Sequence, residues 1–221
     1  MMRNTVDLIP PLLEGLWVTI QVTTGGMVVA FAAAWIAGLA RLYGPKYVRW
    51  VAVAYVEVFR GTSALVQLYW FYFALPFLGL ELSAMQTGIL VLGLNIGAYG
   101  AEVVRGAIQS VDKGQKEASV ALNLSGMQTL WHVVVPQAAV AMMPPAGNLL
   151  VELMKATALV SLITLSDLTF QAQILRSETM RTTEVFLLLL AFYFVLALTI
   201  TRTFRLIEKR IGTFRAPGAA T

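Results

Sequence analysis

Apolar stretches without charged residues alternate with short charged segments along most of the chain. A helix that crosses a membrane needs about 20 residues with few charges, because each residue rises about 1.5 Å through a hydrocarbon core about 30 Å thick. Five stretches meet this requirement, and they predict spans over about residues 15–40, 61–80, 83–104, 133–153 and 184–204. The predicted fold class is therefore all-α, an integral membrane helical bundle of about five transmembrane helices.

Two apolar segments do not fit this scheme of simple spans. Residues 47–59 form an amphipathic-to-apolar pattern around Glu57, directly before Arg60, and we expect a helix along the inner membrane interface. Residues 156–174 begin apolar and become polar, which favours a partly re-entrant or outer-surface helix. Irregular backbone at membrane depth is tolerated only where protein or a water-filled cavity lines it.

Composition supports the membrane assignment. The 221 residues are 58% hydrophobic and 13% charged, whereas a typical soluble domain is about 25% charged. The net charge of +4 could suggest a nucleic-acid partner, but the basic residues lie in short loops beside apolar runs. That distribution is the positive-inside bias of membrane proteins, so we expect membrane lipid and no nucleic acid around this chain.

The same bias predicts the orientation of the chain. Most Lys and Arg residues fall in the loops after the first and third spans and in the C-terminal segment. Placing these residues on the cytoplasmic side puts the N-terminus outside and the C-terminus inside. Residues 1–12 are then an extracytoplasmic segment, without the cleavage pattern of a removable signal peptide, and residues 209–221 are a cytoplasmic tail.

Few residues could carry catalysis. The chain has a single histidine, His132, beside Trp131 at the predicted inner boundary of the fourth span, and it has no cysteine. A metal site built from His and Cys ligands is therefore not expected. No Gly-Lys dipeptide occurs, so the phosphate-binding loop of ATPases is absent and any ATP must bind to another subunit.

Polar residues inside predicted spans mark bundle-interior or pathway positions, because such residues are unfavourable in lipid. Gln67 lies in the second predicted span and Asn95 in the third. Each has an amide that must find hydrogen-bond partners. Lining a solute path and packing inside the bundle explain the two residues equally well.

The fourth predicted span contains the most unusual polar pattern. Pro144 and Pro145 remove backbone donors, so we expect the helix to kink or break there. Asn148 and Glu152 could then face a cavity. Alternatively, Glu152 and Lys155, about one helical turn apart, pair with each other near the outer surface.

A long polar segment, residues 112–137, separates the third and fourth spans. Residues 117–122 are strong helix formers, Asn123 tolerates the left-handed conformation that ends a helix, and Ser125 is a good N-cap. Pro136 then leads the chain back into apolar sequence. Two short cytoplasmic helices at an angle are predicted, and a structured connection of this length normally has a function.

Glu117-Ala118-Ser119 is followed, at fixed spacing, by Asn123 and by Val133-Val134-Val135-Pro136. This arrangement resembles the inner loop of permease subunits of ATP-binding-cassette (ABC) importers of the polar amino acid type, with serine for an alanine and asparagine for the usual glycine. Further blocks resemble the same family: Phe59-Arg60-Gly61-Thr62, Ala98-Tyr99-Gly100-Ala101-Glu102 with Arg105-Gly106, Gly114-Gln115, Pro136-Gln137-Ala138, Pro144-Pro145 with Gly147-Asn148, and Lys155 with Thr157. Together they identify residues 13–208 as one permease domain, with a cytoplasmic coupling loop over residues 106–132.

The resemblance implies the type I ABC importer permease fold and a place in the bacterial cytoplasmic (inner) membrane. It implies three kinds of partner: ABC ATPase subunits, a second permease in a homodimer or heterodimer, and an extracytoplasmic solute-binding protein. ATP and magnesium would bind to the ATPase, so this chain would hold no cofactor or metal of its own. The expected ATPase-coupling residues are Gly114, Gln115, Glu117, Ala118, Ser119, Asn123 and Pro136.

The resemblance also suggests the solute, a polar amino acid or amino-acid derivative. Relatives often have an acidic residue after the lysine of the Lys155 block, and Ala156 in this place argues against a cationic solute such as arginine or histidine. Residues 121–125 and 140–173 are most similar to permeases for compatible solutes of the ectoine type. The substrate-path candidates are Gln67, Asn95, Asn148, Glu152, Lys155 and Thr157.

Two other functions remain open from the sequence. A stand-alone secondary transporter or channel for small polar solutes, driven by an ion gradient, would need no ATPase and would leave the 112–137 segment without a task. An intramembrane enzyme is disfavoured, because the chain lacks a suitable combination of nucleophile and base. We therefore predict that the chain is not an enzyme.

Overall fold

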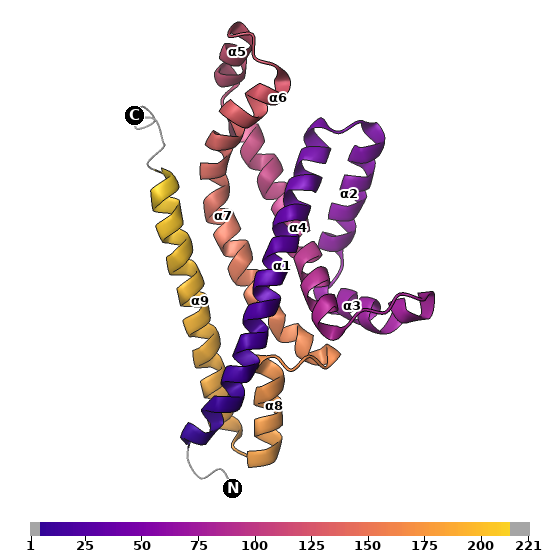
Figure 1. Ribbon diagram of the computed structural model, residues 1–221, viewed down its shortest axis with the longest axis vertical. Coiled ribbons are helices and arrows are strands. Elements are labelled where there is room, and N and C mark those ends of the chain that lie inside the picture. The colour runs from indigo at the N-terminus through magenta and orange to yellow at the C-terminus, as the bar shows by residue number, and fades with distance from the viewer. Residues whose placement is uncertain (1–4, 213–221) are drawn as a thin grey trace.

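The computed structural model describes residues 5–212, and every regular element in these residues is helical. The long helices stand along one axis, with shorter helices at both ends (Figure 1). The α-helices are α1 (Ile9–Tyr43), α2 (Lys46–Gly61), α3 (Ala64–Tyr69), α4 (Ala84–Ser110), α5 (Lys113–Ala121), α6 (Gly126–Gln128), α7 (Val135–Ala156), α8 (Leu168–Thr179) and α9 (Thr182–Gly212). Shorter 3-10 turns lie at Thr5–Leu8, Leu75–Leu78 and Thr157–Ile163, and π-helical turns at Trp70–Ala74 and Thr129–Val134. The all-α prediction is confirmed.

Helices α1 and α4 pack closely along their length. Three glycines of α4, spaced three or four residues apart, face α1, and a Cβ atom on any of them would come within 2.8 Å of an α1 side chain. The glycines are Gly93, Gly97 and Gly100, which lie against Val29, Ala33 and Ala34 respectively. Lipid tails are as apolar as the helices, so close van der Waals packing of small residues stabilises this pair.

Helix α2 packs on the bundle and does not lie along the membrane interface as the sequence predicted. It runs back beside α1 (Figure 1), and Ala52 and Val56 on its inner face are buried. The Tyr55 hydroxyl donates a hydrogen bond to the Leu94 carbonyl of α4 at 2.6 Å. One apolar face of α2 therefore packs against protein, while Tyr47, Trp50 and Val51 stay exposed.

The chain bends sharply after α2. The segment Ala64–Leu78 is inclined at 106° to α2, because Thr62 and Ser63 are extended and interrupt the helical hydrogen bonds. The structure thus differs from the predicted straight span over 61–80. The break lies directly after Arg60, at the start of the uncharged run 61–80, and α2 with Ala64–Leu78 is together long and apolar enough for one broken span or a re-entrant loop.

Proline acts at other places than the sequence indicated. Helix α7 continues from Val135 to Ala156 through Pro144 and Pro145, so the predicted break there is wrong. Widened π-helical turns instead end just before Pro76 and Pro136. A proline ring crowds the carbonyl of the preceding helical turn, and a π turn relieves this crowding by shifting the hydrogen-bond pattern.

Among residues 5–212, four helices are long and apolar enough to cross a membrane, and a fifth crossing results if the bent pair counts as one. The four are Ile9–Tyr43, Ala84–Ser110, Gly126–Ile163 and Thr182–Lys209, which confirms the prediction of about five. The α1–α2 turn, α5, α6 and the end of α9 lie at one end of the bundle, and α8 and the start of α1 at the other (Figure 1). The N-out, C-in orientation and the domain boundaries stay predictions; residues 1–4 and 213–221 of the two terminal segments lie outside the described residues.

The α1–α4 contact can be tested with Gly93→Ala. The added methyl would come within 2.6 Å of Val29, and such overpacking costs about 1–3 kcal/mol, more than the about 0.5–1 kcal/mol gained in helix propensity. The melting temperature of the purified protein in detergent should fall. Gly106→Ala is the matched control on α4, because nothing lies within 4 Å of its Cβ position; equal melting temperatures for the two variants would contradict the packing argument.

Candidate functional site

The segment between α4 and α7 forms the two short helices that the sequence predicts. The Asp112 carboxylate caps α5 by accepting a hydrogen bond from the Gly114 amide at 2.6 Å. Asn123 has a φ of 57° and ends this helical segment in the left-handed conformation. Ser125 then caps α6 in a reciprocal capping box with Gln128. The conformation expected at Asn123 and the cap expected at Ser125 are both confirmed.

Side-chain contacts attach this loop to the long helices. Gln137 of α7 donates from Nε2 to Gln115 Oε1 of α5 at 3.3 Å. The Trp131 ring stacks on Trp35 of α1, with 6.2 Å between centroids and 16° between planes. Ser119 is buried, and its hydroxyl donates to the Gln115 carbonyl at 2.7 Å. The loop is therefore in side-chain contact with both α7 and α1.

The outer surface of the loop combines exposed charge with exposed apolar side chains. Val120 and Leu122 are 71% and 75% exposed, and Met127 is also exposed. Apolar side chains clustered on a polar loop are typical of a surface that binds another protein. Among the predicted coupling residues, Gly114, Gln115, Glu117, Ala118, Asn123 and Pro136 are exposed and Ser119 is buried.

Gln67 and Asn95 hydrogen-bond with each other inside the bundle. Asn95 Nδ2 donates to Gln67 Oε1 at 3.1 Å and to the Phe59 carbonyl at 2.9 Å. Gln67 Nε2 donates to Thr62 Oγ1 at 2.7 Å. The Phe59 carbonyl accepts no helical hydrogen bond because α2 ends here. The side-chain amides of Gln67 and Asn95 donate to it instead. These contacts support the packing alternative for both residues.

The other substrate-path candidates divide into two groups. Thr157 is buried, and its hydroxyl donates to the Met154 carbonyl at 2.6 Å. Asn148, Glu152 and Lys155 are exposed on one face of α7. Glu152 and Lys155 form no ion pair with each other in residues 5–212. A polar face on a membrane helix is unfavourable against lipid, so protein or water must cover it.

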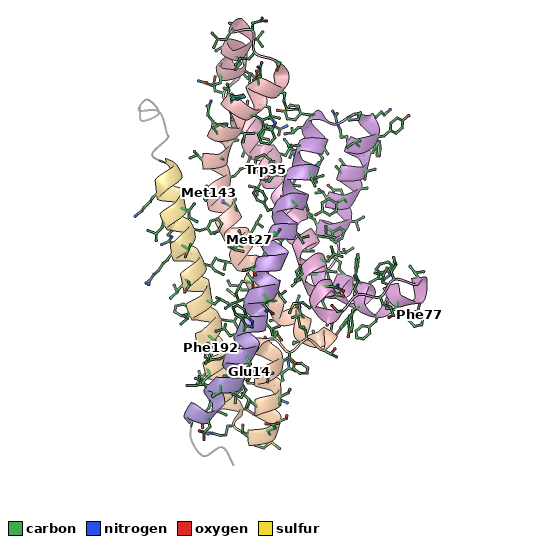
Figure 2. The ribbon with its side chains drawn as sticks, viewed as in Figure 1. Glu14, Met27, Trp35, Phe77, Met143 and Phe192 are labelled. Atoms are coloured by element: carbon green, nitrogen blue, oxygen red, sulfur yellow. The ribbon has the colours of Figure 1, made fainter. Side chains whose placement is uncertain are left out.

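The α7 polar face, defined as Asn148, Glu152 and Lys155, lies on the side of α7 away from α1. The side toward α1 is apolar and encloses a cavity of about 220 Å³ among α1, α4, α7 and α9. Met27 and Trp35 of α1 and Met143 of α7, labelled in Figure 2, line this cavity. Its apolar lining does not suit a polar solute.

Three arginines surround Glu102 on α4. Arg41 of α1 makes a short ion pair with it, and Arg105 donates from Nε to Oε2 at 2.9 Å. Arg60 of α2 approaches Glu102 Oε1 to 3.5 Å and lies over the Tyr99 ring, 5.1 Å from its centroid. The family motifs contain Arg60, Glu102 and Arg105 but not Arg41, and the sequence did not predict that the four residues form one cluster. A charged side chain at the edge of a predicted span is unfavourable in lipid unless another charge neutralises it, and this was the signal that these residues pair.

Asp167 is a second group that sequence analysis did not single out. It is fully buried at the start of α8, where its carboxylate accepts hydrogen bonds from the amides of Thr169 at 3.2 Å and Phe170 at 3.0 Å. Burial raises the pKa of Asp167 to about 6, although these hydrogen bonds act in the opposite direction. Gly15 of α1 lies so close that a Cβ atom would be 2.7 Å from the Asp167 carbonyl oxygen.

No group of three or more His, Cys, Asp or Glu side chains in residues 5–212 is arranged to hold a metal ion.

Comparison with known protein families places the chain in one of them. Residues 26–213 match the family described as "Binding-protein-dependent transport system inner membrane component". The chain belongs to this family.

Individual relatives agree with the family. The permease is 46% identical over 215 residues to the "Probable amino-acid ABC transporter permease protein y4tF" of Sinorhizobium fredii (strain NBRC 101917 / NGR234), with 95% of this chain and 90% of the relative covered. It is 35% identical over 209 residues to the glutamine transport system permease protein GlnP of Escherichia coli (strain K12), covering 92% and 94%.

A solved structure confirms the fold. The permease matches the chain titled "Crystal structure of an amino acid ABC transporter with histidines" with a TM-score of 0.86 and 34% identity, over 95% of this chain and 100% of that one. A chain of the MetNI methionine ABC transporter matches with a TM-score of 0.75 at 20% identity, which supports the fold alone. The protein is therefore a multi-pass inner-membrane permease and not an enzyme, and its fold is that of ABC importer permeases.

The buried carboxyl of Asp167 predicts a pH dependence of stability. In the folded permease it ionises only near pH 6, whereas in the unfolded chain it ionises near about pH 4. The protonated carboxyl therefore makes its full contribution to the free energy of unfolding below about pH 4, and this contribution is lost as the pH rises through 6. Asp167→Asn keeps an N-cap and cannot ionise, so its melting temperature relative to the wild type should rise between pH 4 and pH 7. A difference that is constant across this range would contradict the prediction.

Proposed function

We propose that the permease imports a polar amino acid or amino-acid derivative and receives the energy for transport from ATPase subunits that bind its 112–136 loop. The observation that carries this proposal is the loop itself, a pre-formed two-helix element attached to α7 and α1. The chain has no phosphate-binding loop of its own. ATP and magnesium then bind to the partner ATPase, and this chain supplies the surface that the ATPase moves.

The contacts of the loop support a route for that movement. Glu117 and Ala118 are exposed on α5 and can contact an ATPase groove. The left-handed turn at Asn123 keeps α5 and α6 at a fixed angle. The Gln115–Gln137 hydrogen bond and the Trp131–Trp35 stack then pass displacement to α7 and α1. Pro136, after a π-helical turn, marks the start of the part of α7 that enters the membrane.

The α7 polar face supports a second permease beside this one. Lipid does not solvate a glutamate and a lysine one helical turn apart, so a protein partner or water must cover Glu152 and Lys155. A second permease, identical or a sister subunit, meets both conditions if the solute path runs between the two. Asn148, Glu152 and Lys155 then line the path, and an extracytoplasmic binding protein delivers the solute to it.

The class of solute follows from the relatives. One is named for amino-acid transport and another for glutamine transport, and both cover over nine tenths of this chain. Within this class we propose a zwitterionic solute, with the ectoine type as the specific candidate. The neutral Ala156 after Lys155 supports a solute without an additional positive charge.

Uptake by the reconstituted transporter tests this function. Proteoliposomes containing the permease, its ATPase and its binding protein should accumulate ectoine or L-glutamine only when ATP is inside, and should accumulate L-arginine poorly. Radiolabelled uptake is the measurement. Accumulation that needs no ATPase and follows an imposed ion gradient would instead establish the alternative, a secondary transporter.

Replacing Glu117 by Ala should uncouple the two activities. The complex should keep ATP hydrolysis, while uptake falls by about tenfold or more, because removing a charge-assisted contact costs about 1.5–3 kcal/mol. The measured quantity is solute taken up per ATP hydrolysed. Glu178→Ala, an exposed carboxylate on α8 at the opposite end of the bundle, is the control and should leave this ratio unchanged. Normal uptake by the Glu117 variant would remove the coupling role.

A further inference from the structure

The Arg60 guanidinium is only partly neutralised by its neighbours, and its hydrogen-bond donors are not satisfied by them. Glu102 already accepts hydrogen bonds from Arg41 and Arg105. Arg60 comes no closer to Glu102 than 3.5 Å, and it makes no hydrogen bond to any residue in 5–212. Its side chain is 38% exposed. Three guanidinium groups around one carboxylate leave an excess of positive charge and several N–H donors without an acceptor.

Tyr99 positions this charge. The Arg60 guanidinium lies over the Tyr99 ring, 5.1 Å from the centroid, and cation–π attraction of this kind is stronger where water is partly excluded. The attraction uses no hydrogen-bond acceptor. Arg60 is therefore held in place while its donors stay available to a planar anion such as a carboxylate, which arginine binds through two parallel hydrogen bonds.

Tyr99, with Arg60 over its ring, and the α7 polar face are both directed away from α1. On α4, the glycines at 93, 97 and 100 face α1, and at about 100° per residue the Tyr99 side chain leaves the helix on the far side. On α7, the apolar cavity faces α1 and the polar face points away from it. Both polar groups thus point away from α1, on two helices that pack against each other.

The two groups also lie at a similar depth. A Cβ atom on Gly100 would come within 4.0 Å of the Leu149 side chain, so the neighbouring residues Tyr99 and Asn148 are level with each other along the bundle. The position is near the middle of both α4 and α7. A solute that moves along the α7 polar face would therefore come level with Tyr99 and with the Arg60 guanidinium over its ring.

We propose that Arg60, positioned by Tyr99, binds the carboxylate of the solute beside the α7 polar face. This rests on the proposed function, since it names the group of a zwitterionic amino acid or ectoine-type solute that the permease itself recognises. The solute carboxylate accepts hydrogen bonds from the Arg60 donors that Glu102 leaves unused. Arg41 and Arg105 keep Glu102 neutralised, so its charge does not repel the solute.

The test compares each solute with an analogue whose carboxylate is a carboxamide. Proteoliposomes with the complete transporter take up L-glutamine or L-glutaminamide, L-arginine or L-argininamide, and ectoine or its carboxamide. For the solute that is transported, the wild type should prefer the acid, and Arg60→Gln should reduce this preference by about tenfold or more. The preference of the binding protein is common to both permeases and cancels when the two ratios are divided.

Two further variants separate recognition from folding. Arg49→Gln removes an exposed arginine from the opposite end of α2, away from Glu102, and should keep the wild-type preference. Arg60→Lys keeps the charge but not the paired donors, and should fall between wild type and Arg60→Gln. Solute-independent ATPase activity reports intact assembly. An unchanged preference in Arg60→Gln, or an equal loss in Arg49→Gln, overturns the inference, whereas absence of uptake of all three acids by the wild type overturns the proposed function.

Discussion

The close approach of α1 and α4 is the contact on which the other helix positions depend. Lipid provides no hydrophobic drive between helices, so their association requires backbones near enough for extensive van der Waals contact. The three glycines of α4 allow this approach. It brings Arg41 of α1 to Glu102 of α4 and fixes the rotation of α4 about its own axis. That rotation directs Tyr99 away from the face of α4 that packs on α1.

A second constraint, that polar groups inside a membrane need partners, explains most of the remaining detail. The bend after α2 would leave the Phe59 carbonyl unpaired, and the amides of Gln67 and Asn95 satisfy it. Asp167 similarly caps the amides at the start of α8. Against this background, the polar groups without such partners are informative. The α7 polar face and the Arg60 donors require a solute, water or another chain.

The sequence predicted what local chemistry determines and missed what depends on distant residues. Gaps between charges located the apolar helices, and the preferences of Asn123 and Ser125 determined the loop. The bend at Thr62 and Ser63 was missed because hydropathy locates apolar residues but does not report the direction of the helix axis. Pro144 and Pro145 did not break α7, since the effect of proline depends on the surrounding packing. The Glu102 cluster joins three helices, and no local pattern contains it.

The contacts of α7 differ in kind between its N-terminal end and its middle. At its N-terminal end, α7 is joined to α5 by a hydrogen bond, and Trp131 just before it stacks on Trp35 of α1. Along its middle, it meets α1 across an apolar cavity of about 220 Å³ without directional bonds. Apolar surfaces beside unfilled volume can shift without breaking hydrogen bonds. A shift of α7 along this surface would move the α7 polar face relative to Arg60, whose contacts to Tyr99 and Glu102 tie it to α4.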